Sequence, residues 1–184
     1  YLCEKLFEGQ PACKKRCEEI AKCDRATDYW TETEPDSHLD RNKKWHFANK
    51  ERLKEMQDKA FKGCVDCEFG MYLHALQDSY SHLDAIATGS GWHGPGGKDD
   101  TKKNPTKAVA MAKMTIEELC EYMKKCSATT TTTTCKTETQ ACVCKKDAIT
   151  EEFLNEFMKA SQKEQKVKTE NADPGKELPK FPGV

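Results

Sequence analysis

The sequence predicts a mostly α-helical, single-domain bundle that is stapled by disulfides and carries long Gly-rich and Thr-rich loops. Three observations lead to this fold class. Apolar residues recur at helical spacing in several segments, no segment alternates convincingly with the two-residue period of a half-buried strand, and eleven of the 184 residues are cysteine. A chain of this length can bury a core of its own. Because 33% of the residues are charged and 36% are hydrophobic, the helices should have strongly solvated outer faces.

The apolar pattern places the helices in order along the chain. The first helical segment is expected to break near Pro11, Gly63 should end the second, and Pro105 is well placed to start the fourth. The expected helices span residues 2–22, 45–62, 68–87, 105–123 and 148–160. The composition between them predicts loops at 24–42 and 88–104, and a surface loop or strand edge at the threonine run 129–134.

The domain organisation follows from the same pattern. Residues 1–160 are interpreted as one helical domain, and the polar residues 161–184 as a C-terminal tail. Within the domain, cysteines gather in the segments 1–23 and 120–144. The histidines and the residues that suggest chemistry lie instead between about 27 and 123.

The cysteine content indicates the cellular compartment in which the chain folds. Eleven cysteines favour disulfides formed in an oxidising environment, so the chain is expected to be secreted or extracytoplasmic. The single CxxC, at Cys64 and Cys67, has no second copy at zinc-ribbon spacing and no βαβ context for a redox role. An odd number leaves one thiol free or paired outside this chain, and the spacing alone does not give the pairing.

Charge and motifs exclude several classes of function. Lys and Arg (30) nearly balance Asp and Glu (31), so bulk attraction to nucleic acid or to anionic lipid is not indicated. No apolar run approaches the ~18 residues of a membrane span. The HExxH, GxSxG and phosphate-loop motifs are missing. Since the chain begins at Tyr1 and shows no signal-peptide region, it is expected to be a mature product or a fragment.

The stretch LHALQDSYSH, residues 73–82, carries the strongest functional signal. His74, Asp78 and His82 are spaced by four residues and therefore share one face of a helix. That face differs from the apolar one, so these side chains need not belong to the core. A solvated polar stripe is the competing interpretation. Because three such residues are in register and further histidines lie nearby, a zinc site is favoured.

Three motifs together resemble a known superfamily. They are WHF at 45–47, the sequence GMYLHALQDSYSH at 70–82, and GWHG at 91–94. This pattern is similar to the zinc-dependent phospholipase C and single-strand nuclease superfamily, especially the compact C-terminal toxin domains of bacterial Rhs-repeat proteins. The resemblance covers roughly residues 27–123 and leaves out the cysteine-rich ends.

The resemblance implies one or two zinc ions and a set of ligands. Asp28, His46, His74 and Asp78 would surround the first ion, with Asp28 and Asp78 as the catalytic carboxylates and Asp28 the candidate general base. His82, His93 and an acidic residue, Asp100 or its neighbour Asp99, would hold the second. The superfamily commonly has a longer gap between the helical Asp and the next His, and its third zinc has no visible ligands here.

Several assignments remain open from the residues themselves. His38 is an alternative to His46 if the latter belongs to the core, and Asp36 and Asp40 compete with Asp28 as the upstream carboxylate. Aromatic side chains that could line a substrate cleft include Trp92 and Tyr80.

The leading hypothesis is therefore a zinc-dependent hydrolase that acts on a phosphodiester, either in a phospholipid or in a nucleic acid. The resemblance further implies a secreted bacterial toxin domain, with a parent Rhs-type polypeptide or an immunity protein as partners. The alternative is a non-catalytic, disulfide-rich binding or structural module with a structural metal or none. A display module for the threonine run 129–134 is a third hypothesis.

Overall fold

A computed structural model confirms the mostly α-helical, disulfide-stapled fold. It describes residues 2–30, 32–33, 39–81, 105–127 and 141–157, and within these ranges no residue is in a β-strand. The helices are α1 (Leu2–Leu6), α2 (Pro11–Ala26), α3 (Leu39–Trp45), α4 (Lys50–Gly63), α5 (Asp66–Ser81) and α7 (Pro105–Ser127). A 3-10 turn, η1 (Lys146–Ala148), precedes the helical residues 151–157. None of the described helices is both long and apolar enough to cross a membrane.

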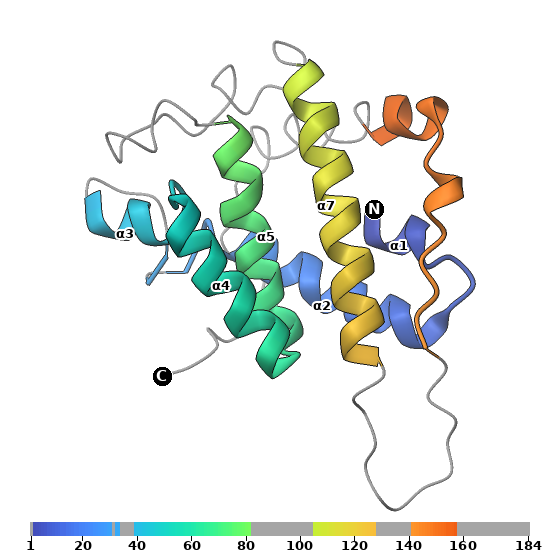
Figure 1. Cartoon of the computed structure of the whole chain (residues 1–184), viewed down its shortest axis with the longest axis horizontal. Helices are drawn as coiled ribbons and strands as arrows, with labels where there is room; N and C mark the ends of the chain where they lie inside the picture. Colours follow the sequence, from blue (N-terminus) through green and yellow to red (C-terminus); the bar gives the residue numbers. More distant parts are fainter. Residues whose placement is uncertain (1, 31, 34–38, 82–104, 128–140, 158–184) are drawn as a thin grey trace, which may run out of the picture.

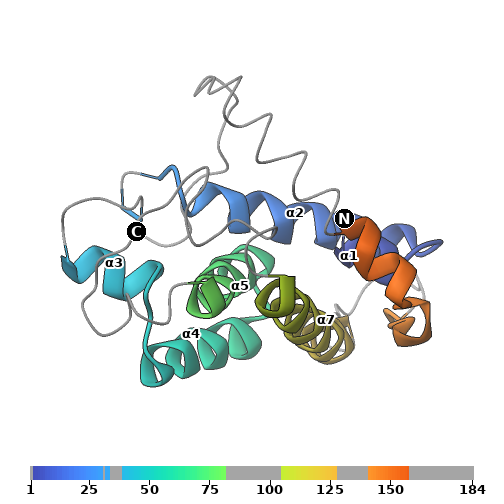
Figure 2. The same ribbon diagram turned by 90° about the horizontal axis from the view of Figure 1, so that it is seen from above.

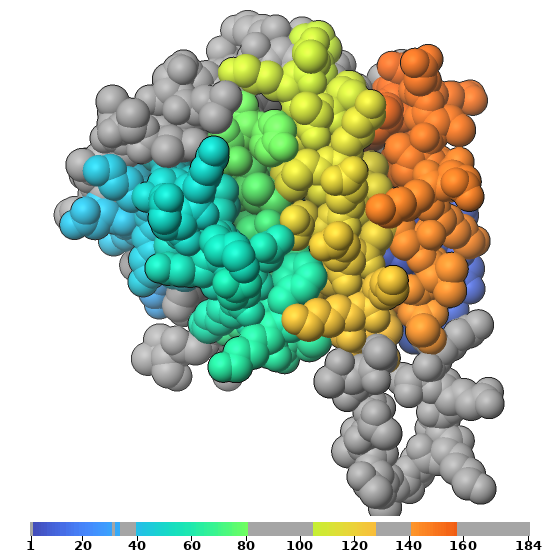
Figure 3. Space-filling model, viewed as in Figure 1, coloured from blue at the N-terminus to red at the C-terminus, as the bar shows by residue number. Residues whose placement is uncertain are grey.

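Helix α5 lies at the centre of the arrangement. Figure 2 shows it between α2 on one side and α4 on the other, with α7 alongside. In the view of Figure 1, α4 and α7 lie in front of α2, and Figure 3 shows these two helices covering much of α5. All residues from 69 to 75 are buried, as expected for a helix that is enclosed on every side.

Local sequence signals determine where these helices begin and end. Pro11 occupies the first turn of α2, where its missing N–H costs no hydrogen bond. The Asn49 side chain caps α4 by accepting a hydrogen bond from the Arg52 backbone N–H. At the other end of α4, Cys64 adopts a left-handed conformation with φ of 51°, and its N–H bonds to the Ala60 carbonyl. The Cys64 cap sets the turn from α4 into α5.

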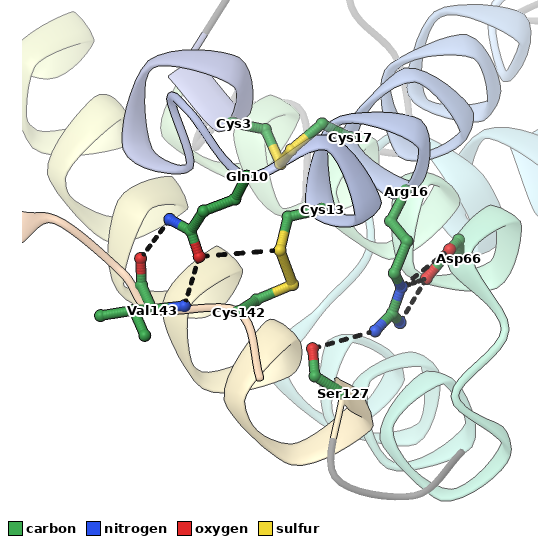
Figure 4. Close-up of a disulfide and its surroundings, with 9 residues drawn as sticks. All are labelled: Cys3, Gln10, Cys13, Arg16, Cys17, Asp66, Ser127, Cys142 and Val143. Atoms are coloured by element: carbon green, nitrogen blue, oxygen red, sulfur yellow. Dashed lines mark hydrogen bonds and ion pairs between the residues drawn. A yellow bond between two sulfur atoms is a disulfide. The ribbon is translucent and has the colours of Figure 1, made fainter. Parts of the chain in front are cut away.

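Five disulfides join the helices to one another and to the C-terminal segment. The pairs are Cys3–Cys17, Cys13–Cys142, Cys23–Cys67, Cys64–Cys126 and Cys120–Cys144. Figure 4 shows the first two, with Gln10 bonding to both the N–H and the carbonyl of Val143 beside them. Cys64 and Cys67 bond to different helices, so the CxxC is not a redox pair. The eleventh cysteine, Cys135, lies outside the described residues.

Helices α2 and α5 lie against each other at Gly70. A Cβ atom at this position would lie 2.9 Å from the Asp24 backbone nitrogen, and closer still to the Ile20 carbonyl oxygen. Only glycine permits this distance between the two backbones. The Cys23–Cys67 disulfide joins the same two helices beside this contact. The pair is therefore fixed both by packing and by a covalent bond.

A polar cluster joins α2, α5 and α7 at the opposite end of α5 from the histidine motif. Arg16 donates through Nε and Nη2 to Asp66, the first residue of α5, and Nη1 lies 3.5 Å from the Ser127 hydroxyl (Figure 4). The Tyr122 hydroxyl donates to the same carboxylate at 2.9 Å. Burial and the nearby Asp66 charge raise the pKa of Tyr122, which therefore stays protonated.

Several expected boundaries were wrong. The predicted loop 24–42 contains the last turn of α2 and the start of α3, and the predicted helix 45–62 is interrupted after Trp45. The interruption arises because the His46 and Phe47 N–H groups both bond to the Asn42 carbonyl, which turns the chain before Asn49 starts α4. The predicted helix 148–160 begins only at residue 151, after the 3-10 turn Lys146–Ala148. The segments 88–104, 129–134 and 161–184 lie outside the described residues.

Candidate metal centre

Four of the predicted ligands meet beside the middle of α5. His74 and Asp78 lie one turn apart on this helix, His46 follows the end of α3, and Asp28 follows the end of α2. His46 is fully buried, and His74 and Asp78 are each 8% exposed. The helical His/Asp face, which the sequence left free to lie outside the core, is buried because α2 and the segment after α3 cover it.

The inner atoms of these side chains lie close together. His46 Nδ1 and His74 Nε2 are 3.0 Å apart, and Asp28 Oδ1 lies 3.3 Å from the His74 atom and 3.9 Å from the His46 atom. Ligand atoms of these three residues all lie within 4.8 Å of one another. Asp78 Oδ2 adds a further oxygen, 3.1 Å from His46 Nδ1 and 3.4 Å from His74 Nε2.

These separations suit a small divalent cation. In a tetrahedral zinc site with bonds of about 2.0–2.1 Å, neighbouring ligand atoms are about 3.3–3.4 Å apart. The five separations above range from 3.0 to 3.9 Å around that value. Two imidazoles and two carboxylates are also a donor set that zinc accepts. The residues present therefore fit the metal that the sequence predicts.

The outer nitrogen of His46 fixes the direction of its inner lone pair. His46 Nε2 lies 2.6 Å from the Thr33 backbone carbonyl. Because a carbonyl oxygen only accepts, Nε2 must carry the proton and donate it. In neutral His46 the lone pair is then on Nδ1, which faces His74 and Asp78. A backbone acceptor behind a ligating imidazole is a common feature of metal sites.

His74 is held in the same way by a carboxylate. Its Nδ1 lies 3.3 Å from Asp24 Oδ1, so this nitrogen donates its proton outward. The lone pair of neutral His74 is then on Nε2, facing Asp28 and Asp78. With both rings neutral, two nitrogen lone pairs and carboxylate oxygens would face one another with no positive charge between them. The centre therefore requires a bound cation or additional protons.

The charges of the metal-free centre show the same requirement. Burial alone would lower the pKa of His74, but the Asp28 and Asp78 carboxylates raise it well above its usual 6.5. Conversely, burial alone would raise the pKa of each of these two carboxyl groups, and the positive His74 lowers both below their usual range. An extra proton on His74 thus balances the site where a divalent cation would otherwise do so.

The remaining predicted site residues are not in this group. Tyr80 is half-buried on α5, and Asp40 is exposed in the first turn of α3. The others fall outside the described residues: His38, His82, His93, Asp36, Asp99, Asp100 and Trp92. The second zinc set, His82, His93 and Asp100, thus stays a prediction, as does a substrate role for Trp92 or Tyr80.

Sequence reasoning missed the two outer partners. The Thr33 carbonyl has no side-chain signal in the sequence, whereas Asp24 does have one. Asp24 precedes Asp28 by four residues, the same spacing that relates His74 to Asp78. That pair was overlooked because residue 24 was taken as the start of a loop.

Two other features of the described residues do not compete with this centre. Glu19, Cys23 and Cys67 could hold a metal by distance, but both cysteines are in a disulfide and their sulfurs are not thiolates. A cavity of about 430 Å³ between α3 and the start of α4 is lined by Asp40, Lys43, Lys44, Phe47, Asn49 and Arg52. It includes none of the four residues of the centre.

Comparisons with known proteins identified no relative. No family model, no curated protein and no solved structure matches the chain.

Proposed function

We propose that the chain is a zinc-dependent hydrolase that cleaves a phosphodiester bond. The observation that carries the proposal is the convergence of His46 Nδ1 and His74 Nε2, 3.0 Å apart, on the Asp28 and Asp78 carboxylates. Each histidine also has its outer nitrogen bound to an acceptor, which directs the inner lone pair at the same point. A polar helix face exposed to solvent would require neither the convergence of these four side chains nor the outer acceptors of the two histidines.

The four side chains would have different roles in binding the ion and in catalysis. Zinc, when bound, supplies a Lewis acid for a phosphoryl oxygen and lowers the pKa of coordinated water to about 7. The two imidazoles and Asp78 are buried, so they would bind the ion in a fixed position on the side away from solvent. Asp28 is the most open of the four, with its side chain 27% exposed, so it can receive a proton from water at the edge of the centre.

The wider context of the proposal rests on the fold and on the sequence resemblance. Five disulfides are typical of proteins that fold in oxidising compartments, which supports secretion. We propose that the chain is a compact toxin-type hydrolase, with an Rhs-type parent polypeptide or an immunity protein as its partner. A phospholipid and a nucleic acid both remain substrates to be tested.

One observation favours a second candidate, a structural metal in a non-catalytic domain. Structural zinc sites have all four positions filled by protein, and catalytic sites keep one open. Here four protein ligands are available and three of them are almost fully buried. The candidates differ in whether the carboxylate of Asp28 occupies the fourth position or leaves it to water.

The test is metal content followed by activity. Protein purified without added metal should contain zinc, and His74→Ala should lose it. Chelation should abolish hydrolysis of a chromogenic phosphodiester, and added zinc should restore it. Asp28→Ala should keep zinc but lose activity if the site is catalytic. If chelation lowers only the melting temperature and no phosphodiester or phospholipid is cleaved, the structural role is correct.

A further inference from the structure

Asp24 lies in the last turn of α2 and is not one of the four ligands proposed above, although its carboxylate is the outer acceptor of His74. Its side chain is 26% exposed, and its Oδ1 lies 3.3 Å from His74 Nδ1. We infer that Asp24 is a positioning residue, which keeps the proton of His74 on Nδ1 and so leaves Nε2 free to bind metal. The inference rests on the proposed metal centre, because its expected consequence is a change in the affinity for zinc.

Asp24 is itself held from two directions. The Gln77 side-chain amide, on α5, donates to Asp24 Oδ2 at 3.5 Å. The Asp24 backbone nitrogen packs against Gly70, where α2 and α5 are in contact. The preceding residue, Cys23, is bonded to Cys67 on α5. Both the backbone and the carboxylate of Asp24 are therefore fixed relative to the helix that carries His74.

This arrangement has a defined chemical consequence for His74. A carboxylate that accepts from Nδ1–H stabilises the tautomer with a lone pair on Nε2, and it makes that nitrogen a stronger donor to a metal. Partners of this kind are typically responsible for a 10–100-fold difference in metal affinity. Neutral His74 without the acceptor would place its proton on either nitrogen, and a proton on Nε2 blocks coordination.

Two substitutions of Asp24 separate this role from a merely structural one. In Asp24→Asn, the side-chain oxygen is drawn toward the Gln77 amide, which donates, so the new amide group faces His74 Nδ1. That amide donates and forces the His74 proton onto Nε2. In Asp24→Ala, water replaces the carboxylate and either tautomer can form. Asn, although nearly isosteric with Asp, should therefore impair metal binding more than Ala does. A structural role predicts the reverse order.

The experiment is a competition titration of chelator-treated full-length protein with zinc. We expect Asp24→Ala to weaken zinc binding about tenfold and Asp24→Asn about 100-fold. Glu18→Gln is the matched control, since it removes an exposed carboxylate from the same helix, and it should bind zinc like the wild type. Melting temperatures and circular dichroism establish that each variant is folded. Equal affinities for the wild type and Asp24→Asn, or a larger loss in Ala than in Asn, would overturn the inference.

A second measurement tests the inference without metal. In ¹⁵N-labelled, metal-free wild type, the His74 Nδ1–H should be protected from exchange with solvent, because Asp24 accepts from it. Protection should be lost in Asp24→Ala and kept in Glu18→Gln. An unprotected Nδ1–H in the wild type overturns the positioning role of Asp24. If the proton is protected but the wild type binds no zinc, the proposed function fails while the hydrogen bond stands.

Discussion

Substitution of Gly70 by alanine should weaken zinc binding even though Gly70 contributes no ligand. Alanine is the better helix former by about 0.5–1 kcal/mol, so propensity alone predicts a more stable α5. The added Cβ would, however, lie 2.9 Å from the Asp24 nitrogen, where ordinary contacts begin at 3.4 Å. Helix α2 must therefore retreat by at least 0.5 Å, and by more at the Ile20 carbonyl.

The size of that movement decides the effect on the centre. Metal–ligand distances tolerate about 0.2 Å, so moving α2 by more than twice this amount misplaces Asp28 and Asp24 relative to His74. Overpacking a core typically costs about 1–3 kcal/mol. After the gain in propensity, a net loss of about 1 kcal/mol remains, which lowers the melting temperature by about 2–4 °C. Zinc affinity should fall at least about tenfold.

The assay compares Gly70→Ala with Gly63→Ala, a matched control on α4. A Cβ at Gly63 would meet its nearest neighbour, Val65 Cγ2, at 3.4 Å, which is an ordinary contact. The control should therefore keep its zinc affinity and melt at or above the wild-type temperature. Zinc titration and thermal unfolding of the metal-free proteins give both numbers. If Gly70→Ala behaves like the control, the two helices are not as close at Gly70 as described, and the reasoning fails.

Three further outcomes are expected. Because the Asp28 and Asp78 carboxylates overcome burial and raise the pKa of His74 well above 6.5, zinc must displace a proton from His74 wherever the pH lies below that raised pKa. Zinc titrations at a series of pH values should therefore show weaker binding at lower pH, approaching tenfold for each unit below the raised pKa; a pH-independent affinity would contradict this. Asp66→Asn should leave Arg16 without its carboxylate and cost up to about 3 kcal/mol in urea unfolding, with zinc affinity unchanged. Replacing Cys13 and Cys142 by alanine should cost about 2–5 kcal/mol, because their disulfide joins α2 to the C-terminal segment, and equal urea midpoints would refute it.

The sequence predicts those parts of the fold and the centre that depend on local spacing. The four-residue step from His74 to Asp78 requires only a helix, and apolar periodicity was sufficient to place α5. Asp28 and His46 were assigned by resemblance, and the structure brings both to the helical pair. The capping of α4 by Asn49 was not anticipated, because Trp45 and Phe47 continue the apolar pattern across the break between α3 and α4.

What could not be predicted depends on tertiary packing. Asp24 has the four-residue spacing to Asp28, but its contact with His74 depends on the packing of α2 against α5 at Gly70, which no spacing in the sequence expresses. For the same reason the five disulfides could not be paired beforehand. For a helix considered alone, with only one apolar side, a solvated stripe on the polar face of α5 competed with a zinc site. Once α2 covers that face, its polar residues are buried and must find partners.

The metal centre and the disulfide framework are therefore parts of one structural solution. Asp28 reaches the centre from the turn that follows α2, and His74 reaches it from α5. The geometry of the site therefore depends on how firmly these two helices are held together. Buried carboxylates and imidazoles repel or attract one another strongly enough to distort a loose pair of helices. The Cys23–Cys67 bond and the glycine contact next to it resist this distortion. A chain with so few hydrophobic residues can thus keep a highly charged group in its interior, because covalent bonds replace part of the missing core.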